Sequence, residues 1–135
     1  MDILFYEILK EELISHNEKS GKPYGNVIVP FATSKTTYPH TVFKEIRNVT
    51  NTQFNSPHDR VASVGYRTDI YAKNKNSIDN ETIARQVAQI VDRFFTYKGL
   101  PRVSFNVSFE GQDQCICHIV MTYMGNLSEY RRNII

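Results

Sequence analysis

The chain has 135 residues, a formal net charge of +2, 41% hydrophobic residues and 22% charged residues. This length fits a single domain with a hydrophobic core, and the composition excludes a chain that is disordered throughout. The small net charge argues against a dedicated nucleic-acid-binding protein, which usually carries a strong basic excess. No apolar run reaches the roughly 18 residues that a membrane span needs, and residues 1–7 do not resemble a signal peptide. We therefore expect no membrane association and folding in a reducing cytoplasm.

The first predicted element is an amphipathic helix that Asp2 can cap. Its apolar residues recur at helical spacing and form one stripe: Phe5, Ile8, Leu9 and Leu13. The pattern fades at His16 and Asn17, and residues 20–25 read as a loop.

Three strands are predicted next, over residues 27–31, 41–49 and 61–73. The second has polar residues on both faces, which favours an edge strand. Residues 50–60 are polar, contain Pro57 and predict an exposed, mobile loop. The third strand alternates most clearly, with one apolar face (Val64, Tyr66, Thr68, Ile70, Ala72) and one mixed face (Gly65, Arg67, Asp69, Tyr71).

A second helix follows, with Asp79 as its N-cap, and Gly99 and Pro101 form a stop signal. Its buried stripe is predicted to contain Ile83, Val87, Ile90, Val91 and Phe94, with Phe95 beside it. Residues 103–109 and 115–124 predict two antiparallel strands joined by a turn at 110–113.

The predicted order of elements is therefore α-β-β-β-α-β-β. It indicates an α+β fold: one domain over residues 1–135, with a mainly antiparallel sheet of about five strands and two helices packed on one face. Residues 126–135 are predicted to form a docking tail.

The sequence contains no motif that predicts catalysis. It has no phosphate-binding loop, no Gly-x-Ser-x-Gly elbow and no close pair of carboxylates. On a strand, His118 would point away from Cys115 and Cys117, so the three cannot converge on a metal without a bulge. We interpret the cysteines as small core residues, and His118 has no visible partner as a general base. We therefore expect a non-enzymatic protein without cofactor or metal.

Two groups of residues are candidates for protein contacts. Arg67, Asp69 and Tyr71 share one strand face, which is either a solvated face or a subunit interface. The tail combines Tyr130, Arg131 and Arg132 with Ile134 and Ile135. A frayed terminus is the alternative, but docking on a partner better explains the terminal isoleucines.

The order of elements and four stretches of sequence resemble the tail-terminator, or tail-completion, proteins of long-tailed bacteriophages. The stretches are residues 38–46 (YPHTVFKEI), residues 63–72 (SVGYRTDIYA), the helix 83–95 with the following Gly99-Leu100-Pro101-Arg102, and the strand 115–123. The resemblance runs from residue 27 onward.

This resemblance implies a virion protein that is assembled in the host bacterial cytoplasm as a ring, commonly a hexamer. Such a ring lies at the head-proximal end of the tail tube, where it ends tube polymerisation and binds the head-closure (neck) protein. Its partners would be its own copies, the major tail tube protein and the neck protein, while DNA would pass through the lumen without being read. We then expect the contacts to involve Arg67, Asp69, Tyr71, Arg102, Tyr130, Arg131 and Arg132.

Three alternatives remain open from the sequence. The chain could be another head–tail connector, either an adaptor or a stopper. It could be a small enzyme or ligand-binding protein that uses His118 or the cysteines. RNA binding would need strand aromatics such as Tyr66, Tyr71 and Phe105 in basic surroundings, which the sequence lacks.

Overall fold

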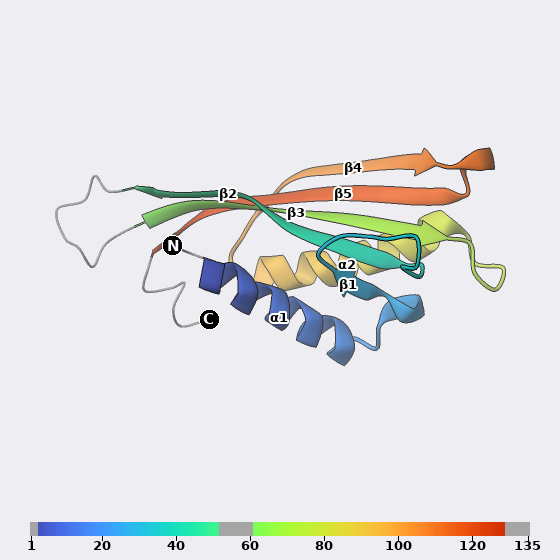
Figure 1. Cartoon of the computed structure of the whole chain (residues 1–135), viewed down its shortest axis with the longest axis horizontal. Helices are drawn as coiled ribbons and strands as arrows, with labels where there is room; N and C mark the ends of the chain where they lie inside the picture. Colours follow the sequence, from blue (N-terminus) through green and yellow to red (C-terminus); the bar gives the residue numbers. More distant parts are fainter. Residues whose placement is uncertain (1–2, 52–60, 129–135) are drawn as a thin grey trace.

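The computed structural model describes residues 3–51 and 61–128 (Figure 1). Asp2, most of the predicted loop at 50–60 and residues 129–135 of the predicted tail lie outside these ranges. The described elements, in chain order, are the helix α1 (Ile3–Lys19), the strands β1 (Val27–Val29), β2 (His40–Asn51) and β3 (Val61–Lys73), the helix α2 (Asn80–Tyr97) and the strands β4 (Arg102–Glu110) and β5 (Ile116–Ser128).

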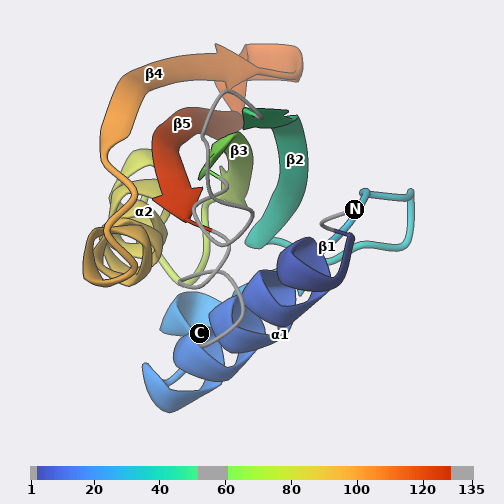
Figure 2. The same cartoon turned by 90° about the vertical axis from the view of Figure 1, so that its left-hand side faces the viewer.

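The five strands form one sheet in the order β1-β2-β3-β5-β4. All neighbouring strands are antiparallel except β1 and β2, which are parallel. Both helices cover the same face of this sheet and leave the opposite face without helices (Figures 1 and 2). The predicted α+β fold and its order of elements are confirmed.

The strand β1 is shorter than predicted and pairs with only the first part of β2. It was expected to reach residue 31 but ends at Val29, because the next residue is Pro30, whose nitrogen cannot donate a ladder hydrogen bond. β1 pairs only with His40–Val42, so the outer edge of the remaining part of β2 has no neighbouring strand within the described chain.

The helix α2 forms where its cap and apolar stripe predict it. The Asp79 carboxylate accepts a hydrogen bond from the Thr82 backbone N–H at 2.6 Å. The predicted stripe is buried apart from Ile90, which is half-buried and accepts a hydrogen bond at its carbonyl from His16 (Nε2 to O, 3.1 Å). The helix ends before Gly99, whose φ of 76° is a left-handed conformation that glycine adopts without strain.

The core lies between the helices and the sheet and is rich in aromatic rings. Phe95 of α2 stacks on Tyr123 of β5 at 4.1 Å between ring centroids, and Phe43 and Tyr66 pack beside them. Fully burying a large apolar side chain contributes roughly 1.5–3 kcal/mol, so this contact between α2 and the central strands is a main source of stability.

The helix α1 is longer than its apolar pattern indicates, because a buried polar cluster holds its last turn. Asn17 donates a hydrogen bond to the Asn26 carbonyl (3.0 Å), and the Asn26 amide donates to the Asn17 side chain (2.9 Å). The Thr41 hydroxyl donates to the Asn26 side-chain oxygen at 3.0 Å. These bonds tie α1 to β2, and they explain why a polar residue occupies a core position.

One of the two cysteines departs from its predicted role. Cys117 is buried in the core as expected, but Cys115 is exposed because the chain reaches it through a short 3-10 turn before β5 begins at Ile116. No helix of the described chain is long and apolar enough to cross a membrane.

Candidate functional site

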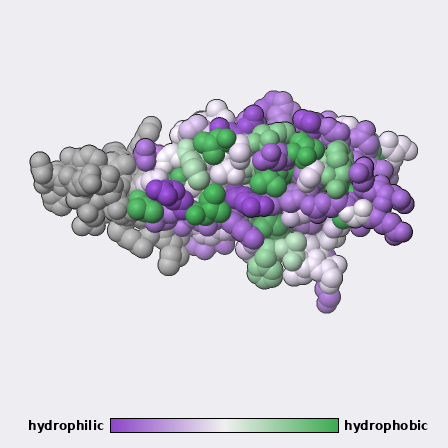
Figure 3. Space-filling view, turned by 90° about the horizontal axis from the view of Figure 1, so that it is seen from above, coloured by the Kyte–Doolittle hydropathy of each residue, from purple (hydrophilic) through white to green (hydrophobic). Residues whose placement is uncertain are grey.

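The candidate site is the helix-free face of the sheet, which Figure 3 shows from above. Alternate residues of β2, β3, β5 and β4 point to this face, since the pairing places residues such as His40, Tyr71 and His118 in one row across the strands. Apolar side chains gather among hydrophilic ones on this surface (Figure 3). The face therefore combines a polar network with an apolar region.

The polar network is centred on Asp69, which is almost buried. Its carboxylate accepts two hydrogen bonds from Arg67 (Nε at 2.7 Å, Nη2 at 2.9 Å) and lies 2.9 Å from His118 Nε2. The other ring nitrogen of His118, Nδ1, lies 2.6 Å from a carboxylate oxygen of Glu110. A continuous chain of Arg67, Asp69, His118 and Glu110 thus crosses β3, β5 and β4.

The neighbours of Asp69 favour the charged form of its carboxyl group. Burial would raise the pKa of Asp69, but hydrogen bonds and charges from Arg67 and His118 prevail and hold that pKa below its ordinary value. Asp69 therefore carries its negative charge between Arg67 and His118.

Aromatic rings stack beside this network. Tyr71 lies on the His118 ring at 4.2 Å between centroids with an interplanar angle of 17°, and its other neighbour is His40 at 5.1 Å. Tyr38 continues the row next to His40 at 5.0 Å, and the Lys73 ammonium lies 4.6 Å from the Tyr38 ring centre. Burial raises the pKa of Tyr71 and lowers the pKa of His40, so both rings stay neutral near pH 7.

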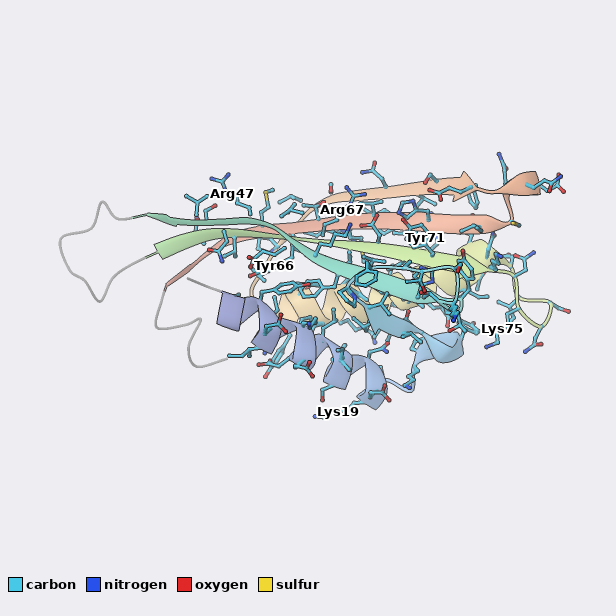
Figure 4. The ribbon with its side chains drawn as sticks, in the orientation of Figure 1. Lys19, Arg47, Tyr66, Arg67, Tyr71 and Lys75 are labelled. Carbon is cyan, nitrogen blue, oxygen red and sulfur yellow. The ribbon has the colours of Figure 1, made fainter. Side chains whose placement is uncertain are left out.

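The apolar region lies toward the other end of the same face, around Gly65. Ile46, Val49 and Met124 are large hydrophobic residues that remain 47%, 50% and 37% exposed. A Cβ at Gly65 would lie only 3.1–3.4 Å from atoms of Arg47, Ile46 and Met124, so these side chains close over the glycine. Figure 4 shows Arg47 on this helix-free side of the sheet and Tyr66 on the helix side.

The two residues that the sequence offered for chemistry, His118 and Cys117, are both enclosed by the fold. Both nitrogens of His118 contact carboxylates, and one face of its ring is covered by Tyr71. Cys117 lies on the core side, where burial raises the pKa of its thiol. Within residues 3–51 and 61–128, no group of three or more His, Cys, Asp or Glu residues is arranged to hold a metal ion.

The structure places only some of the predicted contact residues on the helix-free face. Arg67, Asp69 and Tyr71 do lie together, as the alternation of β3 predicts. Arg102 does not join them: a bulge near the start of β4 turns it to the helix side, where it lies 3.5 Å from Asp92. There it lines a cavity of about 330 Å³ between α2 and β4, with its guanidinium 4.9 Å from the Phe105 ring centre. Tyr130, Arg131 and Arg132 lie outside the described residues.

The sequence reasoning missed the partners of His118. It treated this histidine as a residue without a partner, whereas the fold gives it two carboxylates. The signal was present in the hairpin of β4 and β5, since a turn near residue 112 brings Glu110 and His118 onto the same face. Asp69 could not be found in this way, because nothing in the sequence states that β3 lies next to β5.

No protein-family model matches this chain, and no curated protein matches it.

Proposed function

We propose that this chain is a structural, ring-forming subunit of a phage tail, of the tail-terminator type, and that it contacts neighbouring subunits through the helix-free face of its sheet. The observation that carries this proposal is the exposed apolar group of Ile46, Val49 and Met124 beside a pre-ordered polar network. An exposed apolar patch rimmed by polar residues is typical of protein contact sites.

The polar part of the face suits recognition rather than reaction. Its side chains already hold one another in place, so little conformational entropy is lost when a partner binds. Arg67 remains 45% exposed and can donate further hydrogen bonds, while Tyr71 is half-buried. Arginine and tyrosine are enriched at interfaces for these reasons.

A ring follows if this face binds a different surface of the next copy. Such a head-to-tail contact forms a closed ring when a whole number of equal rotations between copies makes one full turn. Copies of one small domain then form the complete assembly. The resemblance of the sequence to tail-terminator proteins supports a ring at the end of a tail tube, with the major tail tube protein and the neck protein as its partners.

Two measurements test this proposal. The first is the mass of the purified protein by light scattering, for which we expect a closed oligomer. Met124→Glu places a charge in the apolar region and should raise the concentration at which the oligomer dissociates by at least about tenfold. Phe31→Glu is the matched control, because Phe31 is 66% exposed in the loop after β1, outside both the apolar region and the helix layer, and should leave the oligomer intact. An oligomer that tolerates Met124→Glu would place the interface elsewhere.

The second measurement tests the role in the tail. Electron microscopy of particles assembled without this gene should show tails of uncontrolled length that are detached from filled heads. Tails of normal length that are joined to heads would refute the tail-terminator assignment, whatever the oligomeric state of the protein.

A further inference from the structure

A second surface, on the helix layer, has features that the proposed function does not use. An open groove of about 350 Å³ lies along the solvent side of α1 and is lined by Glu7, Ile8, Glu11, Glu12 and Ser15. A neighbouring groove of about 230 Å³ shares Glu12 and Ser15 and continues toward the end of α2 at Phe94 and Tyr97. The two form one valley, which we call the α1 groove.

Around Ile8 the α1 groove is apolar at its floor and acidic at its rim. Ile8 supplies the apolar floor and is half-buried. Glu7 pairs with Lys10 at 2.9 Å, and Glu12 pairs with Lys98 of the α2 end. Glu11 has no ion-pair partner among residues 3–51 and 61–128, so the rim around Ile8 keeps one unpaired carboxylate, whereas Lys19 and Lys98 line the far part of the groove. A segment with both arginines and aliphatic residues would complement this groove.

The chain itself contains such a segment at residues 129–135, with the sequence Glu-Tyr-Arg-Arg-Asn-Ile-Ile. It follows β5, whose end and the first turn of α1 lie at the same end of the molecule (Figure 1). Seven extended residues span at most about 23 Å. The stretch of α1 from Glu7 to Ser15 is about 12 Å long at 1.5 Å per residue. The segment is therefore longer than this stretch of the groove.

We propose that residues 129–135 bind the α1 groove of their own subunit. Arg131 and Arg132 supply the positive charges for the glutamate rim, and Ile134 and Ile135 supply aliphatic surface for Phe94 and Tyr97, which line the groove next to Ser15. The covalent connection to β5 favours this occupant, because a tethered segment acts at an effective concentration near the millimolar range. The inference does not depend on ring formation, and it assigns the tail to α1 rather than to a neighbouring protein.

Cross-linking of the full-length chain tests the position of the segment. Ser15→Cys is combined with Asn133→Cys in a Cys115→Ser background, while the buried Cys117 is retained. Mild oxidation should give a disulfide within one chain, which migrates as a monomer on a non-reducing gel. Lys10→Cys with Asn133→Cys is the matched control, because Lys10 lies on α1 but does not line the groove. Equal linking at positions 10 and 15, or no linking, would overturn the proposal.

Charge exchange tests the chemistry of the contact. Arg131→Glu with Arg132→Glu should lower the yield of the Ser15 cross-link roughly threefold to tenfold, the range expected for two exposed ion pairs. Adding Glu7→Lys and Glu11→Lys should restore the yield. A cross-link that joins two chains would show that a second copy occupies the groove and would refute binding within one subunit. A yield that does not respond to these charges would refute the pairing with the glutamate rim.

Discussion

The network around Asp69 makes a stability prediction that can be worked out from the structure. Asp69→Asn keeps the shape of the side chain but removes its negative charge. The asparagine lacks the negative charge of the aspartate. Its amide N–H₂ group also faces one of the two donors, Arg67 or His118. We expect the variant to fold with the same secondary structure and to be less stable than the wild type at pH 7.

The magnitude follows from the exposure of the two partners. The Arg67 side chain is 45% exposed, so solvent screens its pair with Asp69 and the pair contributes about 0.2–1 kcal/mol. The His118 contact is buried on both sides and, as a hydrogen bond to a charged carboxylate, contributes about 1.5–3 kcal/mol. Because asparagine can still accept one hydrogen bond, we expect a net loss of about 2 kcal/mol. For a chain of 135 residues this lowers Tm by about 7 °C.

The pH dependence gives the decisive assay. The pKa of Asp69 is lower in the folded state than its ordinary value of 3.8, so its stabilisation is complete above pH 3.8 and is lost as the pH falls through the lowered value. Urea unfolding of wild type and variant should differ by about 2 kcal/mol at pH 7, and the difference should shrink as the pH falls below 3.8. A variant as stable as the wild type at pH 7, or a difference that persists unchanged in acid, would refute the reasoning. Asp113→Asn, in the exposed turn before β5, is the control and should change little.

Three further predictions concern single residues. Burial lowers the pKa of His40 below 6.5, so on acidification the unfolded chain binds a proton at His40 at a higher pH than the folded chain does. Stability should therefore fall as the pH drops below 6.5, and His40→Gln should weaken this dependence in thermal unfolding. Tyr123→Phe removes the donor of the 2.8 Å hydrogen bond to Asp92 and should cost about 1 kcal/mol, or about 4 °C in Tm by calorimetry. Gly65→Ala places a Cβ 3.1 Å from that of Arg47 and should cost about 1 kcal/mol in urea unfolding, whereas no measurable loss would show that β2 can shift to make room.

The parts of the fold that the sequence predicted well are those set by local periodicity. The alternation in β3 predicted its bounds and both of its faces, because a strand with one buried face keeps a period of two. The cap and stripe of α2 predicted that helix for the same kind of reason. Arg67, Asp69 and Tyr71 were placed on one face by this signal alone.

The parts that the sequence did not predict depend on contacts between distant segments. The last turn of α1 is held by Asn17, Asn26 and Thr41. The spacing of apolar residues in the sequence cannot predict such a buried polar cluster. Likewise, Asp69 and His118 are 49 residues apart and meet only because β3 and β5 are neighbours in the sheet. The strand order is a property of the whole fold, so the completed network could not be read from β3.

The two proposed surfaces lie on opposite layers of the domain, so the subunit contact and the tail contact can be tested by separate variants. Ile46 and Met124 belong to the helix-free face, whereas Ile8 and Glu11 belong to the helix layer (Figure 1). If the layers act independently, Met124→Glu should dissociate the oligomer and leave the Ser15 cross-link unchanged, since distant sites without shared partners are usually additive. Reversing the charges of Arg131 and Arg132 should do the opposite. A variant that abolished both would mean that the face of one copy binds the α1 groove of the next, and the tail would then compete with the neighbouring subunit for that groove.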